Sequence, residues 1–450
     1  MASLIKLNKG LDINLAGAAE EKLVTTKAVD KITLVPDDFS GSTPKVVVKA
    51  GEAVKAGDVL FTDKLHPEIK FVSPVSGSVE EVVRGDRRKV LGIVIVNDGK
   101  NTSVKLPAVN PTSASADEIK SAMLNAGVWP FIKQRPYNVV ANPEVQPRDI
   151  FVSAMDTAPL APNFTFVVKG QEADLQLGIS ALAKLTSGKV YVGVKAGSNL
   201  QLKDAEIREF AGPHPAGNVS VQINHIKPIN KGEVVWTVSA FDVIVMGRIL
   251  SGKLDFTRTI TVAGSEIITP GYAKVLPGQT LSSILDGKVK HTEYKQRYIA
   301  GNVLTGQNAG KEGVVGFFDN TVTVIPDGGD TDELLGWITP GLKRYSTSNT
   351  SLSGLFGLFK RKRWTLDARL KGGPRALIVS GEWEKVFPMD IYPEELYKAV
   401  LSYNIDKMEA LGIYEVAPED FALCEFVDPS KTPVQQVIAD GLVKLRKEME

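Results

Sequence analysis

The segment Phe151–Pro162 (FVSAMDTAPLAP) places a carboxylate and a hydroxyl, Asp156 and Thr157, directly after a run of strand-forming residues. In sheets that are flanked by helices, ligands bind outside the carboxyl ends of the strands, which makes these side chains candidates for a binding site. The alternative is a structural turn that Asp156 and the following threonine stabilise. The residues alone are compatible with both interpretations.

A second candidate is the loop that opens the segment Gly212–His225 (GPHPAGNVSVQINH). A loop of this kind can wrap around a ring or a phosphate group. His214 is flanked by two prolines, so it would be held rigidly and could donate a hydrogen bond to a ligand. A structural turn is again the alternative, and it needs no ligand.

The segment Leu352–Trp364 (LSGLFGLFKRKRW) joins an apolar run to a basic block. This combination suits an element that lies on a membrane or on a partner, because it offers apolar area together with attraction to anionic headgroups. An ordinary helix end with solvated charges is the alternative. The residues predicted to make a membrane or partner contact are Phe356, Phe359, Lys360, Arg361, Lys362, Arg363 and Trp364.

Composition excludes several other kinds of site. Cys424 is the only cysteine and the four histidines are scattered, so a disulfide framework, a Cys-ligated cluster and an internal metal site are not expected. The sequence lacks the Gly-x-Gly-x-x-Gly dinucleotide fingerprint and the Walker A loop, so no catalytic residue is predicted. A net charge of +1 gives the whole chain no attraction to nucleic acid.

The longest apolar run, Ala240–Leu250 (AFDVIVMGRIL), contains Asp242 and Arg248. It is much shorter than the ~20 residues that a bilayer-spanning helix requires. The N-terminal residues also lack the apolar centre of a secretory signal. We therefore expect a cytoplasmic chain whose contact with a membrane is peripheral or made through partners.

The clearest fold signal is the stretch Lys45–Val96, in which β-branched strands and glycine turns form two similar arms. It resembles the barrel-sandwich domain of biotinyl and lipoyl carriers, in which the connection between the arms presents a modified lysine. Here the connection is Asp63–Lys70 (DKLHPEIK), and the carriers' Asp-Lys-Ala triplet is only half present as Asp63-Lys64-Leu65. Lys64 is either a carrier lysine or a solvated surface residue.

The rest of the chain predicts a mixed α/β and α+β multidomain fold. Alternating strands and helices indicate a Rossmann-like α/β domain, in which Phe164–Lys169 and Asn218–Ile223 are predicted as strands and Glu172–Lys184 as a helix. A small sheet with one helix indicates a β-grasp domain, and amphipathic patterns near the end, including Glu394–Leu411, indicate a helical domain. The expected boundaries are 1–110 for the barrel-sandwich domain with its lead-in, 111–253 for the α/β domain, 254–330 for the β-grasp domain and 331–450 for the helical domain.

Long and unusual blocks follow one another along the chain: IKLNKGLDINLAGA, VSPVSGSV, FVSAMDTAPLAP, GPHPAGNV, LLGWITPG, VFPMDIYP and EDFALCEFVDP. From end to end this series resembles the A subunits of the sodium-translocating NADH:quinone oxidoreductase. The resemblance implies a peripheral subunit on the cytoplasmic face of the bacterial inner membrane, with the other subunits as partners. The complex would couple NADH oxidation and ubiquinone or menaquinone reduction to Na⁺ export (EC 7.2.1.1).

The resemblance also bears on cofactors. Related electron-input subunits carry a flavin loop or a set of cluster-binding cysteines, whereas Cys424 of this chain looks like a remnant of a cluster site. The implied chain therefore binds no cofactor covalently and holds no flavin or iron–sulfur centre. NAD, FMN and iron–sulfur centres would lie in other subunits, and the isolated chain would be inactive.

The resemblance makes quinone the candidate ligand of this chain. A site for quinone reduction requires a hydrogen-bond donor near each carbonyl and an apolar slot for the ring. On chemistry alone, the residues predicted to lie near the quinone are Asp156, His214, Trp129, Phe131 and Tyr137. The alternatives are a lipoyl-like carrier that uses Lys64 and a purely structural docking subunit.

Overall fold

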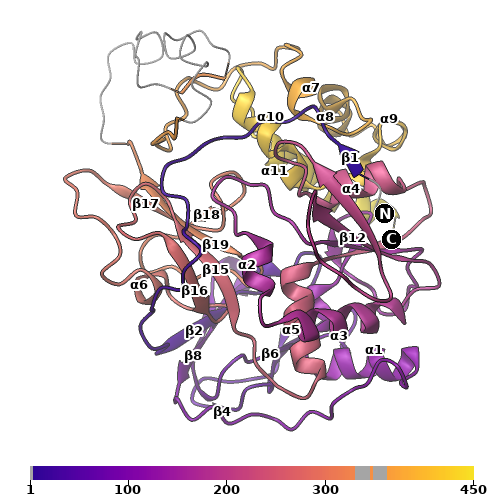
Figure 1. Cartoon of the computed structure of the whole chain (residues 1–450), viewed down its shortest axis with the longest axis vertical. Helices are drawn as coiled ribbons and strands as arrows, with labels where there is room; N and C mark the ends of the chain where they lie inside the picture. Colours follow the sequence, from indigo (N-terminus) through magenta and orange to yellow (C-terminus); the bar gives the residue numbers. More distant parts are fainter. Residues whose placement is uncertain (1–3, 330–344, 348–361, 450) are drawn as a thin grey trace.

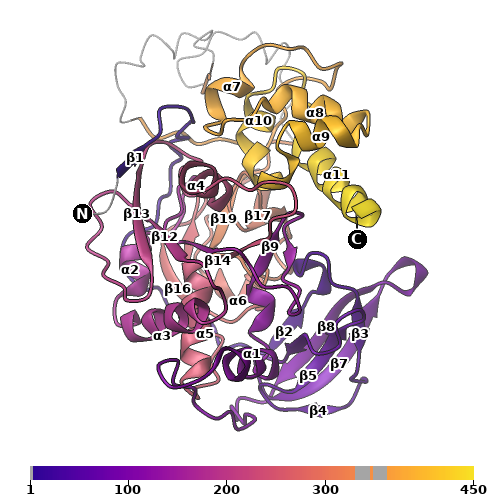
Figure 2. The same ribbon diagram turned by 90° about the vertical axis from the view of Figure 1, so that its right-hand side faces the viewer.

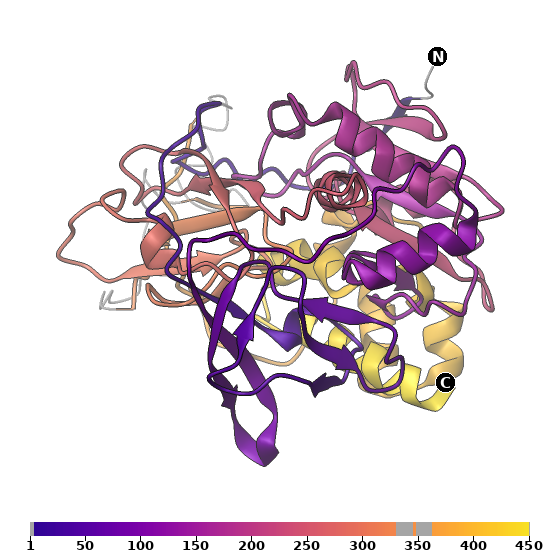
Figure 3. The same cartoon turned by 90° about the horizontal axis from the view of Figure 1, so that it is seen from below.

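The structure is a computed structural model and describes residues 4–329, 345–347 and 362–449. The barrel-sandwich domain lies at one end of the molecule and the helical domain at the other (Figures 1 and 2). The α/β and β-grasp domains lie side by side between them, and Figure 3 shows both behind the barrel-sandwich domain when the molecule is seen from below. The predicted mixed α/β multidomain class is confirmed.

In the barrel-sandwich domain, a sheet in the order β2–β8–β7–β4 shares one core with a smaller sheet in the order β3–β5–β6. The rings of Phe61 and Phe71 stack in that core with their centroids 4.3 Å apart. Phe39 links the core to the β-grasp domain, because its ring lies 4.8 Å from that of Phe317. The strands are β2 (Lys31–Leu34), β3 (Pro44–Val46), β4 (Ala53–Val54), β5 (Val59–Asp63), β6 (Lys70–Val72), β7 (Gly77–Arg84) and β8 (Val90–Asn97).

The lead-in, residues 7–30, runs along the other domains. Gly17 O accepts a hydrogen bond of 2.9 Å from Gly264 N in the β-grasp domain, and Val24 N donates to Tyr272 O over 2.6 Å. Ahead of the lead-in, β1 (Leu4–Lys6) pairs in parallel with β13 at the edge of the α/β sheet. The first residues of the chain thus complete two domains that follow much later in the sequence.

The α/β domain contains a sheet in the order β1–β13–β12–β11–β14–β9–β10. The pairings from β1 to β14 are parallel, and β9 and β10 pair antiparallel. The chain passes from β11 to β12 and β13 on one side and then crosses to β14 on the other side, which makes the gap between β11 and β14 the switch point of the sheet. The strands are β9 (Lys133–Arg135), β10 (Val139–Val140), β11 (Ile150–Ser153), β12 (Val190–Lys195), β13 (Glu206–Ala211) and β14 (Val235–Ser239).

Helices cover both faces of this sheet. Ile150 and Val152 belong to the core that contains α3 and α5, whereas Phe151, between them, packs with residues of α4 on the opposite face. A capping box at Ser115 and Glu118 begins α1. The helices are α1 (Ala116–Asn125), α2 (Phe164–Val168), α3 (Glu172–Ala183), α4 (Val219–Ile226) and α5 (Ala240–Leu250).

Helices α3 and α5 cross closely because each presents a glycine to the other. A Cβ atom on Gly247 would lie 1.8 Å from Asp174 O, and one on Gly178 would lie 2.5 Å from Val243 O. Only residues without a side chain allow the two backbones to approach this far. The crossing holds α5, and therefore the residues at its N-terminus, against the sheet.

Two of the strand predictions for the α/β domain are wrong, because both segments form helices. The segment Phe164–Lys169 contains α2, which begins where the side chain of Asn163 accepts a hydrogen bond from Thr165 N. The segment Asn218–Ile223 forms the first half of α4, in which the successive residues Ser220–Ile223 are all buried. Both segments are rich in β-branched residues, and burial in their tertiary environment overrides that local preference. The predicted helix Glu172–Lys184 is confirmed as α3.

The β-grasp domain has a sheet in the order β16–β15–β19–β17–β18, in which the short helix α6 covers the apolar face. Strands β15 and β19 pair in parallel, and the other pairings are antiparallel. Buried aliphatic residues from both layers form its core. The elements are β15 (Arg258–Ala263), β16 (Gly271–Val275), α6 (Leu281–Ile284), β17 (Gln296–Ala300), β18 (Gln307–Asn308) and β19 (Thr321–Pro326).

The C-terminal helices pack around Trp383, Phe421 and Cys424, which are fully buried. Burial raises the pKa of the Cys424 thiol well above its usual range, as is typical of an inert core cysteine. The predicted helix Glu394–Leu411 is broken, because Tyr403 has a φ of 51° and Asn404 starts a new helix. The helices are α7 (Trp383–Val386), α8 (Pro393–Leu401), α9 (Ile405–Ala410), α10 (Ala422–Val427) and α11 (Val434–Met449).

Candidate functional site

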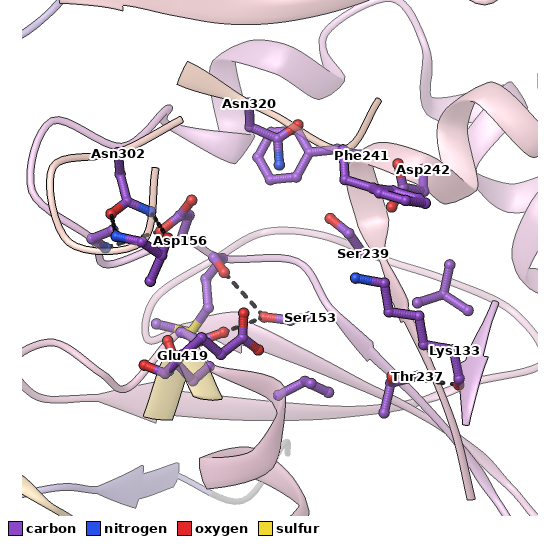
Figure 4. Close-up of a pocket in the computed structure, with 18 of the residues that line it drawn as sticks. Lys133, Ser153, Asp156, Thr237, Ser239, Phe241, Asp242, Asn302, Asn320 and Glu419 are labelled. Atoms are coloured by element: carbon purple, nitrogen blue, oxygen red, sulfur yellow. Dashed lines mark hydrogen bonds between the residues drawn. The ribbon is translucent and has the colours of Figure 1, made fainter. Parts of the chain in front are cut away.

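A cavity of about 230 Å³ lies at the switch point of the α/β sheet. We call it the switch-point cavity. It is bounded by the carboxyl ends of β11 and β14 and by the N-termini of α4 and α5, and loops of the β-grasp and helical domains close it (Figure 4). Residues that line it include Phe131, Lys133, Ser153, Asp156, His214, Asn218, Thr237, Ser239, Phe241, Asp242, Asn302, Phe318, Asn320 and Glu419.

The end of β11 is joined to the start of α4 by hydrogen bonds. Ser153 Oγ lies 2.8 Å from Gly217 O, and Gln222 Nε2 donates to Ser153 Oγ over 3.0 Å. At the same end of α4, Asn218 Nδ2 donates to Asp420 Oδ1 of the helical domain. These contacts fix the floor of the cavity relative to two domains.

His214 lines the cavity with 5% of its surface exposed. Burial lowers its pKa to about 4, so the imidazole is neutral near pH 7. Thr157 Oγ1 accepts a hydrogen bond of 2.9 Å from Gly217 N and lies 3.1 Å from His214 Nδ1. A neutral imidazole carries a proton on one ring nitrogen and accepts at the other, so His214 offers the cavity an uncharged hydrogen-bonding group.

Asp156 forms a turn and also lies at the wall of the cavity. Its Oδ1 accepts a hydrogen bond of 2.9 Å from Ala158 N, which is the expected turn. The residue also lines the cavity, where burial and, to a smaller extent, the charge of Glu419 raise the pKa of the carboxyl. A turn residue is therefore part of the cavity wall.

Aromatic rings and one lysine form the side of the cavity that faces the β-grasp domain. Lys133 Nζ lies over the ring of Phe318 at 4.7 Å from its centroid and forms no ion pair with the residues that the structure describes. Phe131 stacks on Phe317, with centroids 5.3 Å apart, and also lines the cavity. In Figure 4, Lys133, Ser239 and Asn320 reach toward the same space, with Asp156 and Glu419 on the opposite side.

Three of the five residues predicted to lie near a quinone line this cavity, namely Asp156, His214 and Phe131. Trp129 is instead fully buried in the core, where its Nε1 donates to Ala141 O over 2.8 Å. Tyr137 packs edge-on against Tyr414 of the helical domain at 6.3 Å. These two side chains do not line the cavity.

A buried ion pair joins α5 to the β-grasp domain beside the cavity. Arg258 Nη2 donates to Asp242 Oδ1, and both side chains are about 5% exposed. The guanidinium also lies over the rings of Phe131 and Phe317 at 5.6 and 5.8 Å. The pair therefore fixes the N-terminus of α5 relative to β15.

Several lining residues were not predicted from the sequence, including Lys133, Ser239 and Glu419. Two signals were present. Ser239 follows the strand-like run before Ala240, where it is the N-cap of α5, and Asp242 interrupts an otherwise apolar run. Glu419 and the β-grasp residues reach the cavity only through the arrangement of the domains, so no local pattern indicates them.

Lys64 and the described residues of the basic block, Lys362 to Trp364, do not line this cavity. Lys64 is exposed in the connection between β5 and β6, where Asp63 is buried and accepts hydrogen bonds from the backbone N–H groups of Leu65 and His66. Lys362 and Arg363 are exposed, and Trp364 N donates to Asn14 O in the lead-in. The remaining residues predicted for a membrane or partner contact lie outside the described residues: Phe356, Phe359, Lys360 and Arg361.

Within residues 4–329, 345–347 and 362–449, no helix is long and apolar enough to cross a membrane. In the same part of the chain, no group of three or more histidine, cysteine, aspartate or glutamate residues is arranged to hold a metal ion. The residues that line the switch-point cavity offer hydrogen bonding, charge and aromatic contact.

The fold and the cavity define a multidomain protein in which a barrel-sandwich and a soluble-ligand-binding β-grasp domain flank an α/β domain with a site at its switch point. Family models match three of these parts: the NqrA N-terminal barrel-sandwich hybrid domain over residues 5–98, the NqrA second alpha/beta domain over 114–254 and the NQRA C-terminal domain over 259–311. The chain belongs to the NqrA family, the A subunits of the Na⁺-translocating NADH-quinone reductase.

Full-length relatives carry that name. The chain is 35% identical to the A subunit of Serratia proteamaculans, 34% to that of Hahella chejuensis and 33% to that of Neisseria meningitidis serogroup B. Each match covers 99% of this chain and 100% of the relative. Among solved structures, an NAD⁺-reducing NiFe hydrogenase in the air-oxidised state is 13% identical over 75% of this chain and 62% of its own, with a TM-score of 0.38.

Proposed function

We propose that this chain is a peripheral subunit, on the cytoplasmic face of the inner membrane, of a complex that couples NADH oxidation and quinone reduction to Na⁺ export. Its partners are the other subunits of that complex, which hold the NAD, FMN and iron–sulfur sites. The switch-point cavity of this chain contributes to quinone binding by receiving the quinone headgroup. The quinone-binding role is proposed because aromatic rings and hydrogen-bond donors line the same cavity.

The lining chemistry suits a quinone ring with its two carbonyl groups. Phe131 and Phe318 lie on one side of the cavity and offer apolar contact to a flat ring. Lys133 Nζ lies over Phe318, and the Ser239 hydroxyl makes no hydrogen bond with a described residue. Each of these groups is a donor for a carbonyl oxygen, and a charged donor binds an oxygen more strongly as negative charge develops on it.

His214 also lines the cavity and adds an uncharged hydrogen-bonding group. Because its pKa is about 4, the imidazole stays neutral over the physiological range and does not add a second positive charge to the cavity. Several hydrogen-bonding groups around one cavity suit the two carbonyl groups of a quinone, which lie across the ring from one another. This pairing distinguishes a quinone from a ligand with a single polar end.

The proposal is tested by measuring quinone binding and NADH:quinone activity in the assembled complex that carries Lys133→Met. We expect the apparent KM for quinone to rise about tenfold or more, because the variant removes a charged hydrogen bond to the ligand. Lys195→Met is the matched control, since Lys195 lies exposed at the end of the neighbouring strand β12, and it should leave KM unchanged. An unchanged KM in Lys133→Met would remove the quinone role and leave a structural docking role.

A further inference from the structure

A second and larger cavity, of about 500 Å³, lies between the lead-in, the β-grasp sheet and the C-terminal helices. We call it the lead-in cavity. One loop, between β17 and β18, separates it from the switch-point cavity: Asn302 and Thr305 line the first, whereas Val303 and Leu304 line the second. Figure 1 shows the lead-in passing between the strands β17 and β18 and the helices α10 and α11.

The floor of the lead-in cavity is apolar and deep. Leu15 of the lead-in, Ile299 of β17 and Ile325 of β19 line it and are only 5–7% exposed. Phe426 of α10 adds an aromatic side chain, and Ala422 of the same helix adds a short one. Aliphatic side chains of this kind favour contact with an apolar molecule over contact with water. The cavity lies within the usual size range of small-molecule sites, about 300–1,000 Å³.

The residues at its surface end are cationic. Lys371 and Leu370 are exposed there, and Arg369 and Lys431 are half-buried beside them. Asp367 is the acid at this end, and its carboxylate is shared between Arg369, at 2.6 Å, and Lys371, at 3.6 Å. Glu425 also lines the cavity, where it accepts a hydrogen bond from Gln435 N, and Arg297 is paired with Asp327 of the β-grasp domain. The lining thus holds four cationic side chains and two carboxylates, which leaves more cations than acids.

Lys431 is the cation best placed to take a further anion. It forms no ion pair with the described residues, and its side chain passes over Gly372 beside the cavity. The nearby carboxylate of Asp428 is already occupied by the backbone N–H groups of Ser430 and Thr432 and by the Thr432 hydroxyl. Burial lowers the pKa of Lys431, the charge of Asp428 partly offsets that effect, and Arg375 lowers the pKa again. A bound anion would counter both effects.

We propose that the lead-in cavity binds an amphipathic anion, namely a long hydrocarbon chain that ends in a carboxylate or a phosphate. The chain lies against Leu15, Ile299 and Phe426, and the anionic group lies beside Lys431. This assignment rests on two features of the cavity: its apolar floor suits a hydrocarbon chain, and the cations at its surface end suit an anionic group. The inference is independent of the quinone proposal, which concerns the other cavity. A free fatty acid and an anionic membrane phospholipid both have this chemistry.

The experiment measures saturable binding of oleate to the full chain by displacement of a fluorescent fatty acid. We expect Lys431→Glu to weaken oleate binding about tenfold or more, since it replaces an attraction by a repulsion. Lys407→Glu makes the same charge change at an exposed lysine on α9 of the same domain, and it should change affinity less than about twofold. Ala422→Leu fills part of the floor and leaves the charge at Lys431 in place. It should weaken oleate binding as strongly as Lys431→Glu does.

Further arms identify the source of the ligand and the role of its charge. Oleyl alcohol has the same chain without the anion and should bind at least tenfold more weakly, so equal affinity would overturn the proposal. If the chain floats with vesicles of phosphatidylcholine and phosphatidic acid and Lys431→Glu does not, the proposal is supported and a membrane lipid is the source of the ligand. Saturable oleate binding without flotation would support it with a free fatty acid as the source. No saturable binding in either arm, or equal affinity in Lys431→Glu and Lys407→Glu, would overturn it.

Discussion

The buried pair of Arg258 and Asp242 permits a quantitative test of how the domains are held around the switch-point cavity. Both side chains are about 5% exposed, and Arg258 Nε and Nη1 have no hydrogen-bond partner among the described residues. Arg258→Met removes one member of the pair and leaves the Asp242 carboxylate buried without its partner, which costs about 3–5 kcal/mol. Loss of the contacts with the two phenylalanine rings adds about 0.5–2 kcal/mol.

The double variant Arg258→Met/Asp242→Leu removes both charges, so its cost should fall well below the sum of the single variants. We expect a coupling free energy of about 2 kcal/mol or more between the two positions. The assay is denaturant unfolding followed by the fluorescence of Trp129 and Trp236, which pack edge-to-face 5.3 Å apart in the α/β domain. Lys189→Met removes a cation from an exposed ion pair of the same domain and should cost less than about 1 kcal/mol. If the loss of stability in the double variant equals the sum of the two single losses within about 0.5 kcal/mol, the two residues do not stabilise each other and this account of the domain contact is refuted.

Three further predictions concern other parts of the chain. The pKa of His214 is about 4 in the folded chain, against an ordinary value of 6.5. As the pH falls from 6.5 to 4, the unfolded chain therefore binds a proton at this residue before the folded chain does. The free energy of unfolding should fall by about 3 kcal/mol over that range. His214→Gln should abolish that part of the slope in pH-dependent unfolding, and an unchanged slope would contradict it. Gly247→Ala places a Cβ atom 1.8 Å from Asp174 O and should lower stability by about 1–3 kcal/mol, whereas Gly373→Ala, with open space around it, should not. The intact mass of the native chain should show no modification on Lys64, and a lipoyl or biotinyl mass increase would revive the carrier hypothesis.

Local sequence signals predicted the elements whose stability depends on local chemistry. The apolar spacing in Glu172–Lys184 led to α3, and the glycine turns in Lys45–Val96 led to the barrel-sandwich domain. In α2 and α4 the local preference pointed to strands, because valine and isoleucine favour extended backbone when packing is left out of consideration. Their helical state depends on burial against other elements.

The site was only partly predictable for a related reason. Asp156 and His214 could be found because each sits in a distinctive short motif at the end of a strand or in a proline-bordered loop. Lys133, Asn302 and Glu419 come from three domains and meet only in the folded chain. No periodicity or motif in a single sequence records such a meeting, since it depends on how the domains pack.

The measurement that tests the central claim most directly is photolabelling of the assembled complex with a photoreactive quinone, followed by mapping of the labelled peptides. We expect label in this chain on peptides that contain residues 131–138, 153–158 or 237–242, which surround the switch-point cavity. An excess of unmodified quinone should suppress that label, and Lys133→Met should reduce it while Lys195→Met does not. Label confined to other subunits, or found in this chain only on peptides of the lead-in cavity such as 366–371 and 422–435, would contradict the claim.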